Sequence, residues 1–284
     1  MKKAFTLVEL LVVISIISML LAVSLPAMSK AKQAARSLIG SCRQRNIAFA
    51  LTAYATDDNG WYPTSIASPE PGSSTPWREP TLIVAPGTWP YRSVSSYLRN
   101  YIKDAKTIFC PKAPHEFKYL QEIWDAGDDW YSPDGDQFFG AYCFYWNYIG
   151  YVEDDDSPFQ GPSRLSDGRR HSKLLVSDYL GFGHWRNVMT YGRHDAYGSC
   201  DKFNGAGITR GTPVSADFWS RLEDNGNFTL EMMNIKLNAV YTDGHVETYS
   251  PIDTVTMRVS RTPDGTVPCP TIGSAGEFYI PARQ

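Results

Sequence analysis

The chain has 284 residues, of which 43% are apolar and 20% charged, so its composition is that of a folded protein with one large or two small domains. Its net charge of −3 is unevenly distributed: residues 1–56 carry seven lysines and arginines against one glutamate (+6), whereas residues 57–284 carry 20 against 29 acidic residues (−9). A basic segment followed by an acidic globule gives no indication of a nucleic-acid partner.

The first predicted element is a long apolar helix. Residues 10–25 contain no charge, and extending the run back to Phe5 gives just over 20 residues, enough to cross ~30 Å of hydrocarbon. A secretory signal peptide would have a shorter apolar core and a small-residue cleavage site, which is not evident here. A plain membrane anchor fits the length but leaves Glu9 unexplained, because a carboxylate inside such a segment needs a partner.

Helical periodicity continues beyond the apolar run, through residues 29–56. Pro26 is expected to bend or loosen the helix, and Asn59-Gly60 followed by Pro63 is expected to end it. One stripe of mostly apolar or small residues is predicted to pack on the globule. It comprises Ala35, Ile39, Cys42, Asn46, Phe49 and Ala53.

Residues 2–9 complete a recognisable pattern: Lys2-Lys3-Ala4, then Phe5-Thr6-Leu7-Val8-Glu9, then the apolar run containing Pro26. This resembles the prepilin segment of type IV pilins and type II secretion pseudopilins. The resemblance implies that a prepilin peptidase removes a leader of residues 1–4 and methylates the new amine of Phe5. It also implies that the helix packs with copies of itself or other pilins in a filament. The family usually has Gly at the position of Ala4.

The same resemblance gives Glu9 a role, because in a stack of helices its carboxylate can pair with the N-terminal ammonium of a neighbour. It implies an inner-membrane precursor whose helix spans residues 5–28, with an extracytoplasmic globule at 57–284. Counting basic residues alone favours the opposite orientation, since two precede the span and five follow it within about twenty residues. We adopt the orientation that the prepilin pattern implies, because a peptidase recognises this pattern directly.

The globule reads as short strands separated by turns. Strands are predicted within 107–110, 140–152, 173–183 and 184–191, and a hairpin is predicted over 237–250. The hairpin turn is Asp243-Gly244, with His245 starting the returning strand. The predicted fold class is α+β and pilin-like, with the long N-terminal helix packed on an antiparallel sheet. The hairpin also resembles a pilin-like family with a histidine ten residues before Asp-Gly, although this chain has Met233 there.

Metal and catalytic chemistry find little support in the sequence. An acidic loop provides oxygen ligands that calcium would accept, although its spacing is not that of an EF-hand; its members are Asp125, Asp128, Asp129, Asp134 and Asp136. A weaker set is Asp154, Asp155 and Asp156. His171, His184 and His194 near Asp178 and Asp195 are interpreted as unrelated polar residues, since no catalytic motif accompanies them. No cofactor is expected apart from this calcium, and no enzymatic activity is expected.

The cysteines and tryptophans leave alternatives open. None of Cys42, Cys110, Cys143, Cys200 and Cys269 forms a CxxC pair, so zinc is not indicated, whereas one or two disulfides fit an exported globule. Tryptophans in loop-like surroundings would suit a polysaccharide-binding surface. They are Trp61, Trp77, Trp89, Trp124 and Trp130. The predicted function is a structural pilin or pseudopilin subunit. The alternatives are a minor pilin or adhesin on the same stalk, and an enzyme tethered by an ordinary anchor.

Overall fold

The computed structural model describes eleven stretches of the chain. These are residues 7–69, 77–85, 92–111, 120–127, 138–152, 157–168, 171–183, 188–191, 235–262, 264–268 and 277–282.

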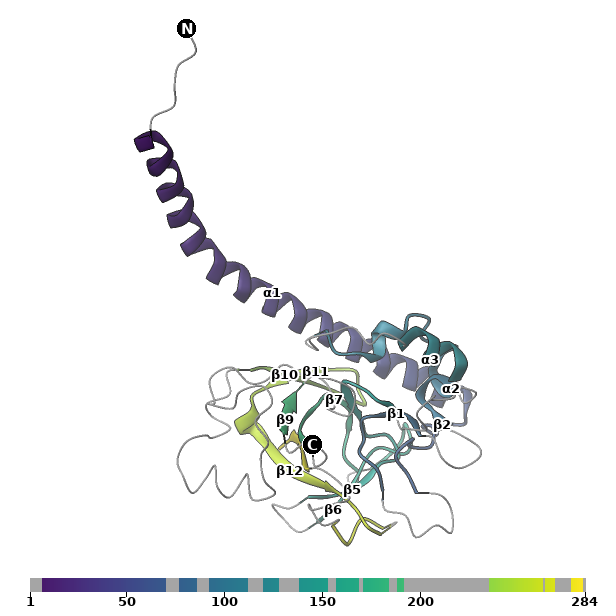
Figure 1. The fold of residues 1–284 in the computed structure, drawn as a ribbon. Helices are drawn as coiled ribbons and strands as arrows, with labels where there is room; N and C mark the ends of the chain where they lie inside the picture. The colour runs from purple at the N-terminus through teal and green to yellow at the C-terminus, as the bar shows by residue number, and fades with distance from the viewer. Residues whose placement is uncertain are drawn as a thin grey trace, which may run out of the picture.

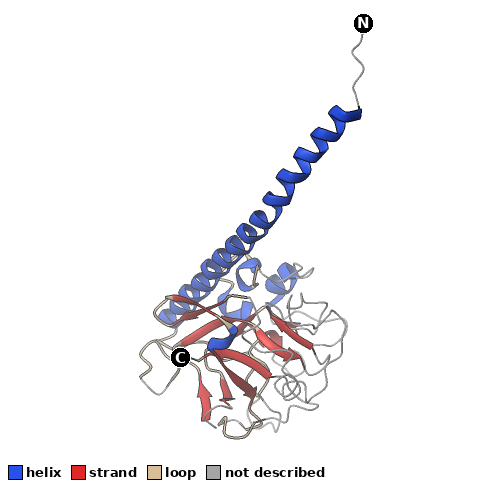
Figure 2. Cartoon of the chain, turned by 90° about the vertical axis from the view of Figure 1, so that its left-hand side faces the viewer, coloured by secondary structure: helices blue, strands red, loops and turns tan. Residues whose placement is uncertain are grey.

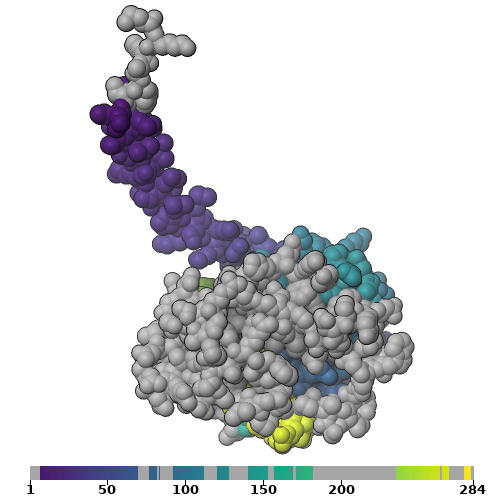
Figure 3. All heavy atoms as spheres, in the orientation of Figure 1, coloured from purple at the N-terminus to yellow at the C-terminus, as the bar shows by residue number. Residues whose placement is uncertain are grey.

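Helix α1 (Leu7–Asp57) runs unbroken for 51 residues, which corresponds to about 76 Å. Its N-terminal half stands clear of the globule, and its C-terminal half lies against it (Figures 1 and 3). The helix continues through Pro26 and curves along its length (Figure 1). Proline lacks the N–H that would bond to the carbonyl four residues earlier, and its ring crowds that carbonyl, so curvature is the expected consequence.

The helix ends as the sequence predicts. Asn59 and Gly60 both have positive φ, at 53° and 86°, and the N–H of Gly60 donates to the carbonyl of Ala55 at 2.6 Å. Such left-handed residues turn the chain out of the helix while satisfying its last carbonyls.

Three antiparallel sheets make up the described globule. The sheet that carries α1 has the order β11-β10-β7-β4, and its strands are β4 (Tyr142–Phe144), β7 (Leu174–Asp178), β10 (Leu237–Tyr241) and β11 (Val246–Tyr249). The largest has the order β6-β5-β12-β13-β8-β9, with strands β5 (Ile149–Val152), β6 (Ser157–Gln160), β8 (Leu180–Gly183), β9 (Val188–Tyr191), β12 (Thr254–Val259) and β13 (Glu277–Pro281). The smallest has the order β2-β1-β3, with strands β1 (Leu82–Ala85), β2 (Arg92–Ser93) and β3 (Phe138–Phe139).

The described residues also form four short helices: α2 (Val94–Leu98), η1 (Ala105–Ile108), α3 (Leu120–Ala126) and η5 (Pro251–Asp253). The distal half of α1 packs on β10, β7 and β11, and also contacts η1 and α2. Figure 2 shows the helix lying along one side of the strands. The predicted α+β arrangement, a long N-terminal helix on an antiparallel sheet, is therefore confirmed.

The hairpin predicted over 237–250 is confirmed, with Leu237 opposite Tyr249 and Val240 opposite Val246. Three other strand predictions need correction. Residues 105–108 form the 3₁₀ helix η1 instead of a strand at 107–110, because the Asp104 side chain accepts from the Lys106 N–H at 2.9 Å and caps a helical turn.

The aromatic run 140–152 forms two strands, β4 and β5, instead of one. Asn147, between them, has a φ of 49°, and its side-chain amide donates to the carbonyls of Tyr62 (2.9 Å) and Pro63 (2.8 Å). A left-handed asparagine held in this way breaks the extended chain and ties the turn to the segment after α1. The segment 173–183 is likewise divided, at Tyr179, between β7 and β8 of different sheets.

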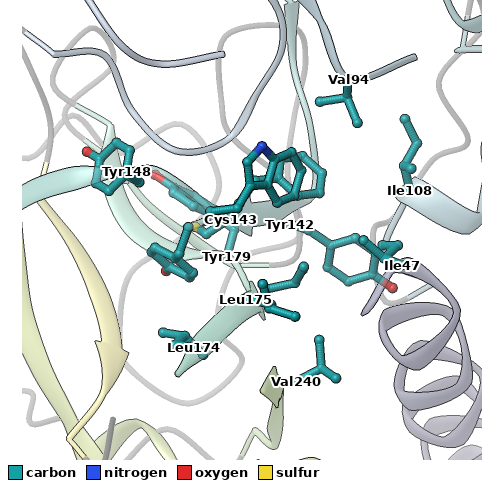
Figure 4. Close-up of a cluster of buried hydrophobic side chains, with 14 of the residues drawn as sticks. Ile47, Val94, Ile108, Tyr142, Cys143, Tyr148, Leu174, Leu175, Tyr179 and Val240 are labelled. Atoms are coloured by element: carbon teal, nitrogen blue, oxygen red, sulfur yellow. The ribbon is translucent and has the colours of Figure 1, made fainter. Parts of the chain in front are cut away.

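The core lies between the sheets and beneath α1 (Figure 4). Its largest fully buried side chains are Trp124, Trp146, Tyr142, Tyr145, Tyr148, Phe278, Ile47, Leu51 and Ile83. Ile47 and Leu51 come from α1, so the distal half of the helix is part of the globule's core.

The face of α1 that packs on the sheet is opposite to the predicted one. The buried positions are Gly40, Gln44, Ile47, Ala48, Ala50, Leu51 and Ala55. At 100° per residue, the centre of this set is roughly opposite the predicted stripe, of which Ile39, Cys42 and Phe49 are exposed. The face that packs on the sheet combines two large apolar residues, Ile47 and Leu51, with small residues and one glutamine.

Candidate functional site: the exposed helix and its junction with the sheet

The N-terminal half of α1 is an exposed apolar rod. Its large apolar side chains from Leu7 to Met28 are all solvent-exposed. Within the described ranges, α1 is the one helix long and apolar enough to cross a membrane by length and composition, and its most apolar stretch is not buried. Apolar surface on this scale is unfavourable in water, so this half of the helix requires lipid or protein around it.

The structure places the predicted processing and assembly residues as follows. Ala4 and Phe5 lie outside the described residues. Glu9 lies in the first turn of α1, on the exposed part of the rod, and Pro26 lies inside the helix near the end of the rod.

A buried polar junction, which the sequence did not reveal, fixes the distal half of α1 on the sheet. Asp178, at the end of β7, is fully buried. One of its carboxylate oxygens accepts from the Gln44 side-chain amide at 3.0 Å and from the Cys110 thiol at 3.4 Å. The other accepts from the backbone N–H of Asn238 on β10 at 2.8 Å. Asp178, Gln44, Cys110 and Asn238 are called the junction below.

Further hydrogen bonds extend the junction along α1. The Asn238 side-chain amide donates to the carbonyl of Ser37 at 3.1 Å, and Arg43 donates to the carbonyl of Phe109 at 2.9 Å. Gln44 also donates to the carbonyl of Asn238 at 3.1 Å. Because buried polar groups are costly unless they are paired, these bonds define one rotation and one height of the helix on the sheet. The sequence feature that could have indicated the junction is Asp178, an aspartate at the end of the apolar run of β7.

The Asp243-Gly244-His245 turn is exposed and ordered. Gly244 has a φ of 81°, as the predicted hairpin turn requires, and the Asp243 carboxylate accepts from the His245 N–H at 3.0 Å. The same carboxylate lies 2.5 Å from His245 Nδ1, and the imidazole stacks on the Tyr241 ring with centroids 4.5 Å apart. Partial burial raises the pKa of Asp243, but the hydrogen bonds from His245 outweigh this and hold the pKa below its ordinary value.

The other predicted site residues do not come together in the described part of the chain. Asp125 lies on α3 and accepts from Gln121 at 2.9 Å, while the other four calcium candidates lie outside the described residues, as do Asp154–Asp156. His171 lies 4.0 Å from Asp167, whereas Asp178 belongs to the junction. His184, His194 and Asp195 also lie outside. Among the described residues there is no group of three or more histidine, cysteine or acidic side chains placed to hold a metal.

Two of the five tryptophans proposed for a polysaccharide surface are core residues, so this prediction is wrong for them. Trp77 is 6% exposed and Trp124 is 2% exposed. Trp61 is exposed, but the Arg164 guanidinium lies over its ring, 3.2 Å from the centroid, and occupies one face. Trp89 and Trp130 lie outside the described residues.

The described cysteines are thiols. Cys42 is exposed, Cys143 is buried, and Cys110 donates to Asp178. Burial raises the pKa of the Cys143 thiol to about 12, so it is protonated at neutral pH and unreactive. None of these three forms a disulfide, and the pairing of Cys200 and Cys269 lies outside the described residues.

Comparison with known proteins identifies the N-terminus. Residues 1–25 match the family model described as the prokaryotic N-terminal methylation motif. No curated protein and no solved structure matches the chain. The match covers the first 25 residues, which include the start of the exposed apolar helix, and it supports a type IV pilin-like N-terminal end.

Proposed function

We propose that this protein is a structural subunit, a pilin or pseudopilin, of a type IV-like pilus or a type II secretion pseudopilus. The observation that carries the proposal is the methylation motif at residues 1–25 together with the exposed apolar rod of residues 7–28, most of which lies within the matched range. A rod of this kind suits two environments, the bilayer before assembly and a bundle of helices afterwards.

In this proposal a prepilin peptidase cleaves between Ala4 and Phe5 and the new amine is methylated. Residues 5–28 span the inner membrane in the precursor, and residues 57–284 lie on the extracytoplasmic side. In the filament, the Glu9 carboxylate pairs with the N-terminal ammonium of a neighbouring subunit. Pairing matters there because an ionised carboxylate enclosed by apolar side chains costs several kcal/mol without a counter-charge.

No enzymatic role is proposed, since the motif belongs to a structural class. The resemblance of the hairpin to the pilin-like family with an Asp-Gly-His turn is part of this proposal, supported by the ordered turn at residues 243–245. The alternative of a polysaccharide-binding minor pilin draws no support from the three tryptophans that the structure describes, because Trp77 and Trp124 are buried and Arg164 covers one face of Trp61.

The test is substitution of Glu9 in cells that assemble the protein. Glu9→Gln should reduce the filament yield at least tenfold, because the neutral amide cannot offset the neighbour's ammonium. Sheared-filament immunoblotting and electron microscopy measure the yield. Glu122→Gln, at an exposed carboxylate on α3, is the matched control and should leave the yield unchanged.

Two results would contradict the proposal. Filaments that persist in the Glu9→Gln variant would show that the proposed pairing of Glu9 is not needed for assembly. A mature protein whose measured mass still includes residues 1–4 would show that the cleavage on which this pairing depends does not occur. Mass spectrometry of protein from cells gives the second measurement directly, and a start at methylated Phe5 is the expected result.

A further inference from the structure

Three tyrosines meet where α2 lies beside the C-terminal end of α1 (Figure 1). They are Tyr54 on α1, Tyr97 on α2 and Tyr101 just after α2, here called the tyrosine cluster. The centroid of the Tyr54 ring is 5.8 Å from that of Tyr97 and 6.4 Å from that of Tyr101, with interplanar angles of 83° and 71°. All three rings pack against the core but are only partly buried. The core therefore holds the rings in place, and part of each stays open to a ligand.

Two carboxylates, Asp57 and Asp58, lie beside the tyrosine cluster. Asp57 Oδ2 accepts from the hydroxyl of Tyr101 at 2.6 Å, and this bond raises the pKa of Tyr101. Burial raises the pKa of Tyr54, and the negative charge of Asp58 raises it further. Both hydroxyls are therefore neutral at physiological pH, and both rings lie in the negative potential of a carboxylate.

The position of Asp57 and Asp58 is unfavourable for the helix itself. The last carbonyls of a helix carry partial negative charge, which basic side chains stabilise and acidic side chains oppose. The last turn of α1 has no basic residue, the helix ends at Asp57, and Asp58 follows. Within the described ranges neither carboxylate forms an ion pair with a lysine or arginine, although Arg99 and Lys103 flank Tyr101 in sequence. A bound cation would supply the missing counter-charge, and a local conflict of this kind is typical of a functional site.

The aromatic surroundings indicate which kind of cation fits. The face of an aromatic ring attracts cations through its quadrupole, and rings grouped in this way are used to bind quaternary ammonium groups. Such a group carries methyl carbons on its surface, so it packs on rings and needs few hydrogen-bond acceptors. A metal ion instead needs several oxygen or nitrogen ligands. In the part of the chain that the structure describes, no set of three acidic, histidine or cysteine side chains is placed to hold one.

We propose that the tyrosine cluster, together with Asp57 and Asp58, binds an alkylated ammonium group such as the trimethylammonium of choline. The rings contact the methyl groups, and the carboxylates balance the charge. The site lies on the globule, at the end of α1 away from the apolar rod. The inference is independent of the proposed function, since neither a filament nor a membrane takes part in the binding.

Binding of choline to the full-length protein in maltoside detergent tests the inference. Nuclear magnetic resonance of choline with isotopically labelled methyl groups measures the Kd. The matched control ligand is the neutral alcohol of the same shape, in which carbon replaces the ammonium nitrogen. Choline should bind about tenfold more tightly than this alcohol, because only the cation is attracted by the rings and the carboxylates. Equal affinities for the two ligands, or no saturable binding of choline, would overturn the inference.

Substitutions of Tyr54 separate a binding site from a cluster that only packs α1 on α2. Tyr54→Phe keeps the ring and should leave the Kd for choline within about twofold of wild type, whereas Tyr54→Leu removes the ring and should raise the Kd about fivefold. Thermal melts of both variants show that they are folded. Wild-type affinity in the Tyr54→Leu variant would show that the ring does not contact the ligand.

The carboxylates provide a second test, which does not alter the packing of the rings on the core. Asp57→Asn combined with Asp58→Asn should raise the Kd for choline about fivefold, because the amides no longer balance its charge. Asp264→Asn, at an exposed carboxylate between β12 and β13, is the matched control and should leave the Kd unchanged. Equal affinities in the double variant and in this control would contradict the role of the two carboxylates.

Discussion

Asp178 connects three parts of the chain that are distant in sequence. Its carboxylate accepts from Gln44 on α1, from Cys110 after η1 and from the backbone of Asn238 on β10. A buried carboxylate is tolerated only when donors replace its lost hydration, and here the donors come from the elements that must meet. Asp178 therefore acts as a positioning residue for α1.

The stability of the protein should depend on this side chain. Asp178→Ala leaves the Gln44 amide and the Asn238 N–H without this acceptor, so we expect the free energy of unfolding to fall by about 2–4 kcal/mol. Asp178→Asn should also destabilise the folded protein, because the NH₂ group of the asparagine cannot accept a hydrogen bond and would face one of the donors that Asp178 now pairs. Urea unfolding of the detergent-solubilised chain measures the change. Asp125→Ala, exposed on α3, is the control, and an Asp178→Ala variant with the wild-type midpoint would refute the role.

At the scale of elements, the hairpin shows what sequence alone could predict. Asp243-Gly244 between two alternating runs specified the turn and the strands, because only a few residues accept positive φ. The extent of α1 was likewise predictable from its apolar run and its terminating Asn59-Gly60. These features depend on local chemistry.

The rotation of α1 was predicted wrongly, and distant residues explain part of it. The predicted stripe contains Phe49 and Ile39, whereas the face on the sheet combines Gly40 and Gln44 with the large apolar residues Ile47 and Leu51. Gln44 faces the sheet because Asp178 accepts from it, and Gly40 does so because even a Cβ there would lie 3.3 Å from the Asn238 amide. Polar pairing and close backbone approach thus act together with the burial of Ile47 and Leu51 to set this face.

The hairpin gives a prediction at the same scale. Gly244→Ala must hold a side chain at a φ of 81°, which should cost about 1 kcal/mol and lower the melting temperature by a few degrees. The new methyl group has room, since its nearest neighbour, a carbon of Phe49, is 3.4 Å away. Gly168→Ala is the control, because no atom lies within 4 Å of the added carbon. Equal melting temperatures for the two variants would show that the turn is not strained by a side chain.

At the scale of the whole molecule, the two halves of α1 have different surroundings. Its first half is exposed and apolar and lies largely within the residues that match the methylation motif, whereas its second half buries Ile47, Leu51 and Ala55 in the core of the globule. The charge divides the chain at a different point, the end of α1, with a basic helix and an acidic remainder. The junction at Asp178 fixes the second half of α1 on the sheet.

This division predicts where the chain can be cut. A protein truncated to residues 29–284 loses the exposed rod and keeps the buried positions of α1, so it should be soluble and should unfold cooperatively. One truncated to 57–284 loses Ile47 and Leu51, whose burial is worth about 1.5–3 kcal/mol each, and removes Gln44 from the buried carboxylate of Asp178. We expect this shorter chain to aggregate or to lack a cooperative melt in circular dichroism. A melt for 57–284 within a few degrees of that for 29–284 would show that the sheet stands without the helix, and the junction would then be an attachment instead of part of the core.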